Sequence, residues 1–158
     1  MSRIEQPRPV LNVLLVEDSP GDVRLTHEAF REANPSVRLH VTVDGVDAMA
    51  FLKNQAPYAA APRPDMILLD LNLPKKDGRE VLAEIKSDDS LKRIPTVILT
   101  TSDSEQDIVK SYQLQANVYL TKPVRLEDFE RLIKVINDFW LTAAKLPQRI
   151  KINERQQP

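Results

Sequence analysis

The chain contains four runs of apolar residues that each lead to a polar side chain suited to phosphate or metal chemistry. VLNVLLV leads to Glu17 and Asp18, MILL to Asp70, TVIL to Thr100, and VYL, one residue further on, to Lys122. Strands of a parallel sheet that is buried on both faces read as such near-continuous apolar runs. Open α/β sheets bind their ligands beyond the carboxyl ends of the strands. We therefore expect these polar side chains to converge at one edge of a sheet.

The same pattern predicts five strand–helix units. The predicted strands cover residues 10–16, 37–43, 66–70, 96–100 and 118–120, and helices follow at about 20–34, about 46–53, from Gly78, after Ser102, and at about 127–141. Apolar and polar residues alternate through 37–43, as in a half-exposed strand at a sheet edge. Such units predict an α/β fold with a doubly wound, five-stranded parallel sheet. The half-exposed second strand favours the flavodoxin-like strand order 2-1-3-4-5.

Two of the predicted helices have distinctive features. Ser102 and Glu105 have the spacing of a capping box ahead of the fourth helix. The last helix carries a wide apolar stripe, made of Phe129, Leu132, Ile133, Ile136 and Trp140 and widened by Val135 and Phe139. Because this stripe is broader than one sheet contact requires, we interpret it first as deeper burial of a terminal helix. A surface for a partner or for self-association is the alternative.

Composition and length narrow the classes of function. The 22 Lys+Arg and 23 Asp+Glu residues leave a formal net charge of -1, which gives no overall attraction to nucleic acid or to an anionic membrane. The absence of cysteine excludes disulfides, zinc–thiolate sites and cysteine nucleophiles. The three glycines are too far apart for a P-loop or a dinucleotide-binding loop. The residues after Leu141 are too few for a helix-turn-helix module, so we expect no DNA binding.

The length of 158 residues predicts one folded domain. We assign residues 10–141 to this domain, 1–9 to an N-terminal extension, and 142–158 to a basic tail that we expect to be mobile, with Lys145, Arg149, Lys151 and Arg155 against one acid, Glu154. No apolar run approaches the roughly 20 residues that cross a bilayer, and the N-terminus lacks the apolar stretch of a signal peptide. We therefore expect a cytoplasmic protein without membrane contact.

The converging side chains have the chemistry needed to place a phosphoryl group on an aspartate. Mg²⁺ prefers oxygen ligands and keeps several waters, so the carboxylates of Glu17, Asp18 and Asp70 would hold it. Asn72 is spaced to offer its backbone carbonyl to the same ion. A carboxylate is a poor nucleophile toward a phosphoryl donor unless nearby cations neutralise the developing charge.

Two further side chains complete this chemistry. The ammonium of Lys122 is placed to neutralise the developing charge, and the hydroxyl of Thr100 is suited to donate to a phosphoryl oxygen. An aspartate-nucleophile phosphohydrolase would also begin with an aspartate after a buried strand. Such an enzyme needs a second acid to protonate the leaving group, and Asn72 occupies the place where that acid would most simply lie.

With these residues the chain resembles a response-regulator receiver domain, the phosphoacceptor module of two-component signalling. The resemblance covers about residues 10–141 and rests on Glu17-Asp18, Asp70, Pro74, Gly78, Thr100 and Lys122-Pro123, with 30 residues from Asp70 to Thr100 and 22 from Thr100 to Lys122. It implies that a histidine kinase phosphorylates Asp70 with Mg²⁺ as cofactor, that Glu17, Asp18, Asp70 and the Asn72 carbonyl bind the ion, and that Thr100 and Lys122 contact the phosphoryl group. It also places Tyr119 at the family's switch aromatic, whose ring is expected to turn inward when Thr100 moves.

The segments LNLPKKDGREVL and ANVYLTKPV narrow the resemblance to the single-domain response regulators of cyanobacterial phytochromes, which implies a phytochrome-type kinase. Three features depart from the commonest receiver pattern: Glu17 replaces the first aspartate, Thr101 replaces a small residue, and the loop at 53–64 is longer than usual. The loop lies away from the predicted site.

We therefore expect a stand-alone phosphoacceptor rather than an enzyme, with no catalysis beyond its own phosphorylation and dephosphorylation. Phosphorylation would reshape the face formed by the fourth helix, fifth strand and fifth helix and signal to a downstream protein. Receivers often form a homodimer through this face, and the wide stripe on the last helix is compatible with one. The main alternative is a receiver-like interaction module that is not phosphorylated.

Overall fold

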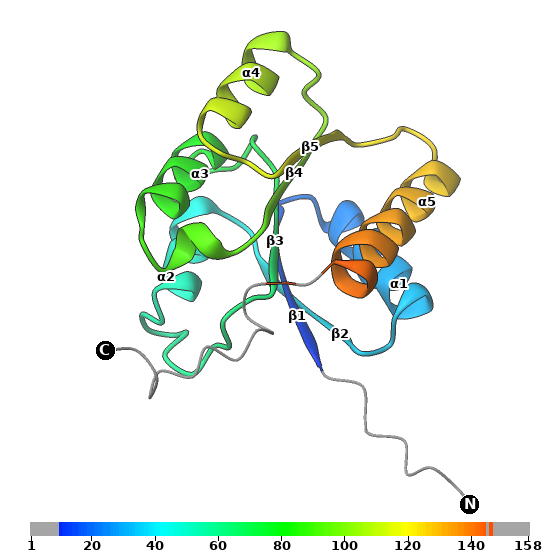
Figure 1. The fold of residues 1–158 in the computed structure, drawn as a ribbon, viewed down its shortest axis with the longest axis horizontal. Helices are drawn as coiled ribbons and strands as arrows, with labels where there is room; N and C mark the ends of the chain where they lie inside the picture. The colour runs from blue at the N-terminus through cyan, green and yellow to red at the C-terminus, as the bar shows by residue number, and fades with distance from the viewer. Residues whose placement is uncertain (1–9, 145, 147–158) are drawn as a thin grey trace, which may run out of the picture.

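A five-stranded parallel sheet forms the centre of the molecule, which we describe from a computed structural model over residues 10–144 and 146 (Figure 1). The strands are β1 (Leu11–Val16), β2 (Val37–Thr42), β3 (Met66–Leu69), β4 (Thr96–Thr100) and β5 (Val118–Thr121). Their order in the sheet is β2-β1-β3-β4-β5. The α/β class, the strand order and the edge position of the second strand are therefore confirmed.

Helices cover both faces of this sheet. They are α1 (Pro20–Ala33), α2 (Gly45–Leu52), α3 (Gly78–Ser87), α4 (Glu105–Gln113) and α5 (Leu126–Ile136), with a 3₁₀ turn, η1 (Leu91–Arg93), and a π-helical segment, η2 (Asn137–Ala143). Figure 1 shows α1 and α5 on one side of the sheet and α2, α3 and α4 on the other. No helix among the described residues is long and apolar enough to span a bilayer.

The core consists of two apolar layers, one on each face of the sheet. Alternate residues of each strand point to opposite faces, so Leu14 and Val16 pack with α2 and α3, whereas Val13 and Leu15 pack with α1 and α5. Every residue of β3 and of β4 is buried, while the edge strands β2 and β5 are only partly buried. The apolar runs of β1, β3 and β4 thus belong to strands that are covered on both faces, whereas the short run of β5 lies at a partly buried edge.

The fourth helix begins later than the capping-box spacing suggested. Its N-cap is Ser104, whose Oγ accepts a hydrogen bond from the backbone N–H of Asp107 at 3.1 Å. Ser102 lies two residues further upstream, and its hydroxyl donates to the Asp107 carboxylate at 2.6 Å instead. The prediction that Ser102 and Glu105 form the capping box was therefore wrong, because both serines have cap chemistry and the loop path selects the second one.

The wide apolar stripe of the last helix is only partly buried. Phe129, Ile133 and Ile136 lie in the core, but Val135 is 62% exposed and Phe139 59% exposed. Deeper burial of the terminal helix is therefore wrong for these two residues, since α1 and the sheet cover only one side of the helix. The N-terminal extension at 1–9 and nearly all of the expected basic tail, including its four basic residues, lie outside the described residues.

A glycine holds the start of α3 against the end of β3. The backbone N–H of Gly78 donates to the Leu71 carbonyl at 2.9 Å. A Cβ atom at Gly78 would overlap the Asp70 carbonyl oxygen and would lie 2.5 Å from the Leu71 Cα. Only a residue without a side chain can therefore start this helix while Asp70 keeps its place.

We predict that Gly78→Ala lowers the free energy of unfolding by about 2–3 kcal/mol, because backbone atoms must shift to admit the methyl group. Gly21→Ala is the matched control: a Cβ there meets no atom nearer than Ser19 Oγ at 4.0 Å. That change should leave stability within about 1 kcal/mol of wild type, on the stabilising side. Urea denaturation measures both values. Equal stability of the two variants would contradict the close-contact explanation.

Candidate functional site

The carboxyl ends of four strands bring the predicted site residues together. Glu17 directly follows β1, Asp70 follows β3, Thr100 ends β4, and Lys122 follows β5. Because β3 lies between β1 and β4 in the sheet, Asp70 occupies the centre of this edge. The convergence expected from the apolar runs is confirmed by the direct contacts among these side chains.

The ammonium of Lys122 lies among three carboxylates. Its Nζ donates to Glu17 Oε2, to Asp70 Oδ2 at 2.9 Å and to Asp22 Oδ2 at 2.9 Å. Its side chain is only 6% exposed. Burial alone would lower the pKa of Lys122, but the hydrogen bonds to the three carboxylates outweigh it and hold the pKa above its ordinary value. Lys122 is therefore a permanently charged cation within the site.

Asp22 is a site residue that the sequence pattern did not identify. At the cap of α1, its backbone N–H bonds Ser19 Oγ at 3.3 Å. Its carboxylate, in the first turn of α1, also reaches Lys122. The available signal was its place in the first turn of the helix that follows Glu17 and Asp18, since the start of such a helix lies at the same edge as the strand end.

Both carboxylate oxygens of Asp70 have hydrogen-bond donors. Oδ1 accepts from the Thr100 hydroxyl at 2.7 Å and from the Asn72 backbone N–H at 3.1 Å, while Oδ2 accepts from Lys122. Burial would raise the pKa of Asp70, but the hydrogen bonds from Lys122 and Thr100 hold it below its ordinary value. Asp70 is therefore ionised at neutral pH, as a carboxylate nucleophile must be.

Glu17 has the opposite protonation behaviour. It is 2% exposed, and burial raises the pKa of its carboxyl to about 7, with the nearby Asp70 charge adding to the rise. Hydrogen bonds from Lys122 and from the Ser19 backbone N–H, at 3.0 Å, limit that rise. Two buried carboxylates thus share one ammonium, and the proton on Glu17 relieves their repulsion.

Three carboxylates of this edge form a group that fits a divalent cation. One oxygen each from Glu17, Asp18 and Asp70 lies within 4.8 Å of the others, and Asp18 is exposed on the solvent side. Carboxylate oxygens with room for water are the donor set that Mg²⁺ prefers. Asn72 is exposed and adjoins Asp70 through its backbone N–H. The role of its carbonyl as a further ligand stays a prediction.

Tyr119, the expected switch aromatic, lies next to the site but outside the carboxylate group. Its ring is partly buried against the core layer of α2 and α3, and its hydroxyl donates to the Ser102 carbonyl at 2.7 Å. Ser102 lies two residues after Thr100, so Tyr119 is linked to the loop that leaves the site. Its movement on phosphorylation stays a prediction.

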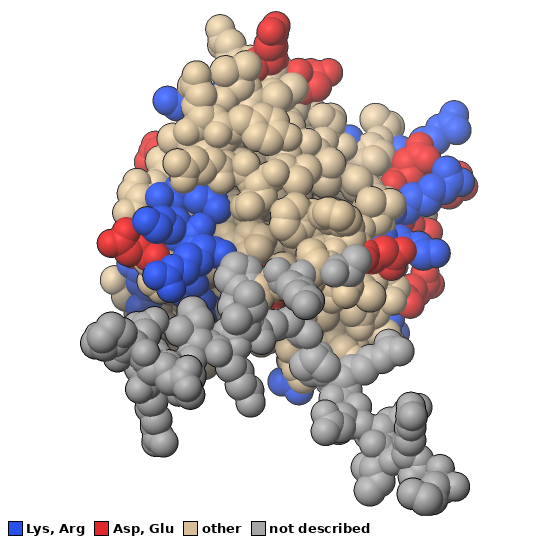
Figure 2. Space-filling model, in the orientation of Figure 1, with Lys and Arg blue, Asp and Glu red and all other residues tan. Residues whose placement is uncertain are grey.

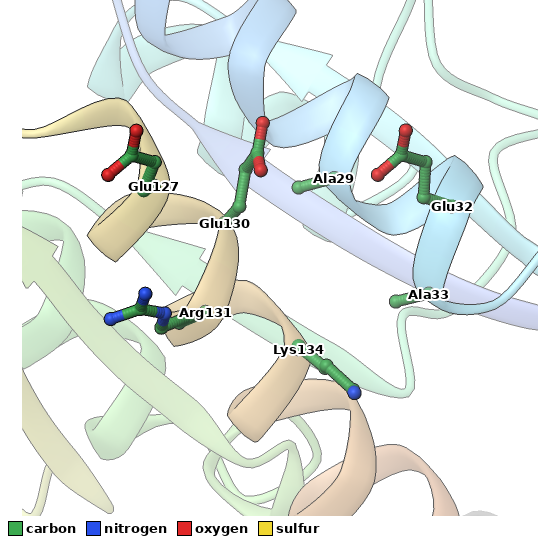
Figure 3. Close-up of a pocket in the computed structure, with 7 residues that line it drawn as sticks. All are labelled: Ala29, Glu32, Ala33, Glu127, Glu130, Arg131 and Lys134. Carbon is green, nitrogen blue, oxygen red and sulfur yellow. The ribbon is translucent and has the colours of Figure 1, made fainter.

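A groove elsewhere on the molecule does not overlap this site. It has a volume of about 530 Å³ and runs between α1 and α5, as Figure 3 shows, and it is lined by Ala29, Glu32, Ala33, Glu127, Glu130, Arg131 and Lys134. None of these residues belongs to the carboxylate group. The chemistry therefore lies at an open edge of the sheet rather than in this hollow.

Comparison with known proteins gives the same family that the residues suggested. The family model of the response regulator receiver domain matches residues 13–136. The chain is 50% identical over 143 residues to the response regulator Rcp1 of Synechocystis sp., covering 90% of this chain and 97% of Rcp1. The match thus covers most of this chain and nearly the whole length of Rcp1.

Two solved structures support this assignment. The phosphorylated cyanobacterial phytochrome response regulator RcpA is 51% identical with a TM-score of 0.85, and the Mn²⁺-bound form of Rcp1 is 52% identical with a TM-score of 0.83. Each comparison covers 87% of this chain and 99% of the other. The chain belongs to the response regulator receiver domain family, whose cofactor is Mg²⁺, and its carboxylate group fits that ion.

We predict that Mg²⁺ binds more tightly as the pH rises through 7. The proton on Glu17 must leave before its carboxylate can bind the ion, so affinity increases until Glu17 is ionised and then levels off. For a pKa of about 7, the dissociation constant should fall about tenfold between pH 6 and pH 8.

Isothermal titration calorimetry measures this dependence, and repeating it in buffers of different ionisation enthalpy counts the released proton. Glu17→Gln is the control, because it cannot titrate: its affinity should be weaker and nearly independent of pH in this range. A wild-type affinity that does not change with pH would show that Glu17 stays ionised without the metal.

Proposed function

We propose that this protein is a phosphoacceptor response regulator in which a histidine kinase of the phytochrome type phosphorylates Asp70. The observation that carries the proposal is the placement of Asp70. Its two carboxylate oxygens contact the Thr100 hydroxyl and the Lys122 ammonium, beside the metal-binding carboxylates. The similarity to a phosphorylated phytochrome response regulator supports both the acceptor role and the kind of kinase.

In the proposed reaction, a carboxylate oxygen of Asp70 attacks the phosphorus of a phosphohistidine. The new O–P bond forms as the P–N bond breaks, and the imidazole nitrogen leaves with the electron pair. The lowered pKa of Asp70 keeps the nucleophile ionised, and Lys122 neutralises charge on the phosphoryl oxygens. Mg²⁺ bound by Glu17, Asp18 and Asp70 would supply further positive charge at the same oxygens.

Two other functions are less well supported. A phosphohydrolase of this kind would most simply carry its leaving-group acid two residues after Asp70, but Asn72 stands there and supplies only its backbone N–H to Asp70. A receiver-like module that is not phosphorylated would not need the metal-binding acids, acceptor, hydroxyl and lysine together, and all of them are present. The site is also compatible with a phosphoacceptor that removes its own phosphoryl group. A histidine kinase as partner agrees with the expected cytoplasmic location.

We predict that wild-type protein gains one phosphoryl group when incubated with Mg²⁺ and acetyl phosphate, and that Asp70→Asn gains none. Intact-mass spectrometry measures the change, and chelation of Mg²⁺ should abolish it. Asp103→Asn is the control, because Asp103 is an exposed acid in the nearby loop and should leave the gain intact. A gain that persists in Asp70→Asn would refute Asp70 as the acceptor. Transfer from a purified phytochrome-type kinase tests the partner.

We propose that this receiver contacts other proteins through the face formed by α4, β5 and α5. Figure 2 shows an area without charged side chains over the centre of the view, below the tip of α4, while charged side chains gather at the right, where Figure 1 places α5 and α1. Large apolar side chains are exposed on α4 and α5: Val109 at 48%, Tyr112 at 49% and Val135 at 62%, with Phe139 following α5 at 59%. Exposed apolar side chains of this kind support a protein contact, and we propose a homodimer as well as a downstream protein target.

We predict that Val109→Glu weakens this homodimer by at least about tenfold, because a carboxylate would be buried without a partner. Val46→Glu is the matched control, since Val46 has a similar exposure, 54%, but lies on α2. Sedimentation velocity over a concentration series, with and without acetyl phosphate, measures the association. A monomeric wild type in both states, or equal weakening by Val46→Glu, would contradict the proposed face.

A further inference from the structure

A series of polar contacts runs from Asp70 through the loop after β4 and the start of α4 to α3, and it ends at Leu71, the residue after Asp70. Thr100 Oγ1 donates to Asp70 and accepts from the Ser102 backbone N–H at 3.5 Å. The Ser102 hydroxyl donates to Asp107, in the first turn of α4, at 2.6 Å. Asp107 in turn is bound by Arg79, whose Nη1 lies 3.5 Å from the Leu71 carbonyl. The loop after β4 and the loop after β3 are thus connected through side chains.

The contact between Arg79 and Asp107 is the strongest link of this chain. Arg79 Nε donates to Oδ1 at 2.8 Å and Nη2 donates to Oδ2 at 2.7 Å, so the guanidinium and the carboxylate meet as a two-pronged pair. The side chains are 32% and 17% exposed. The hydrogen bonds from Arg79 and Ser102 hold the pKa of Asp107 below its ordinary value, so the pair is ionised at neutral pH.

Arg79 and Asp107 come from two helices that differ in how they are anchored. In α3, Val81, Leu82 and Ile85 are completely buried in the core. In α4, whose nine residues are all described, Ser111 is the one buried residue. The apolar anchoring of α4 is therefore weak, and its polar contacts at the N-terminus contribute much of what fixes its position.

We propose that the Arg79–Asp107 ion pair is a latch that holds the N-terminus of α4 against α3 and is released through Ser102 when Asp70 is phosphorylated. The proposal rests on the proposed function of Asp70. When the Thr100 hydroxyl turns to a phosphoryl group, Ser102 moves with the backbone of this loop. Asp107 then loses one of its two side-chain donors, and the Tyr119 hydroxyl loses a fixed acceptor at the Ser102 carbonyl. The firmly packed α3 stays in place while α4 shifts.

The test is hydrogen–deuterium exchange over residues 101–113 in the unmodified and the phosphorylated protein. In unmodified Arg79→Met and Asp107→Asn, exchange in this segment should be at least about fivefold faster than in wild type. The added effect of phosphorylation should be correspondingly smaller. Arg79→Lys keeps the charge but cannot form the two-pronged contact, so it should give an intermediate rate. Arg79 also pairs with Asp77, and Asp107 also accepts from Ser102, so each single variant removes one further contact. The combined effect of the two changes should therefore be much less than the sum of the single effects, because both remove the Arg79–Asp107 pair.

The controls separate a latch from a general loss of stability. Arg24→Met removes an arginine from an exposed ion pair on α1 and should leave exchange at 101–113 unchanged. Intact-mass measurement should show that Arg79→Met still gains a phosphoryl group, because Arg79 touches neither Asp70 nor Lys122 side chains. Faster exchange throughout the protein, or loss of the phosphoryl gain in Arg79→Met, would overturn the latch.

The failure of the latch and the failure of the proposed function have different signatures. A phosphoryl gain in wild type together with wild-type exchange in Arg79→Met would overturn the latch alone. A wild type that gains no phosphoryl group would overturn the proposed function, and the switching role of the pair with it. Faster exchange confined to 101–113 in Arg79→Met, together with a retained phosphoryl gain, supports the proposal.

Discussion

The buried ammonium of Lys122 is the interaction on which the rest of the site depends. Glu17 and Asp70 are both almost completely removed from water, and an isolated buried carboxylate costs several kcal/mol in desolvation. Lys122 supplies hydrogen bonds to both, and the exposed side of the cluster is extended by Asp22 and Asp18. The parallel pairing of the strands makes this possible, because it places the carboxyl ends of β1, β3, β4 and β5 at one edge. Without the cation, Glu17 and Asp70 could not both stay buried while Asp70 remains ionised.

The two central carboxyl groups of the site differ in pKa, in a way that suits a phosphoacceptor. Asp70 accepts hydrogen bonds from Thr100, Asn72 and Lys122, which keep it ionised. Glu17 accepts from Lys122 and from the Ser19 backbone N–H, and burial raises its pKa to about 7, so it retains a proton more readily. In the metal-free protein, the proton on Glu17 thus reduces repulsion without weakening the nucleophile. A divalent cation can take over that task, because it neutralises the same carboxylates more effectively than a proton on one of them.

The two helices that follow β3 and β4 differ in how firmly they are packed: α3 is anchored in the core, whereas α4 is held mainly by polar contacts. On the β3–α3 side, Gly78 allows backbone contact behind Asp70, and α3 is anchored by three fully buried aliphatic side chains. On the β4–α4 side, the connection runs through hydroxyl groups and one ion pair, and Ser111 is the one buried residue of α4. A change of charge at Asp70 therefore meets less resistance toward α4 than toward α3. The exposed apolar side chains of α4 lie on the helix that can move, which links the site to a surface suited to protein contact.

The sequence by itself determined the sheet, its strand order and the residues at the centre of the site. Runs of Val, Ile and Leu directly reflect burial on both faces, and the ends of parallel strands share one edge, so Glu17, Asp70, Thr100 and Lys122 could be brought together from pattern alone. Only the tertiary structure decided that Asp22 binds Lys122 and that Arg79 binds Asp107, because these contacts depend on the distance between helices, which local periodicity does not specify. It also decided that Ser104 rather than Ser102 caps α4, since two serines with the same local chemistry differ only in the path of the loop. The exposure of Phe139 has the same kind of cause: helical spacing shows which residues share a face, whereas the neighbouring elements decide how much of that face is covered.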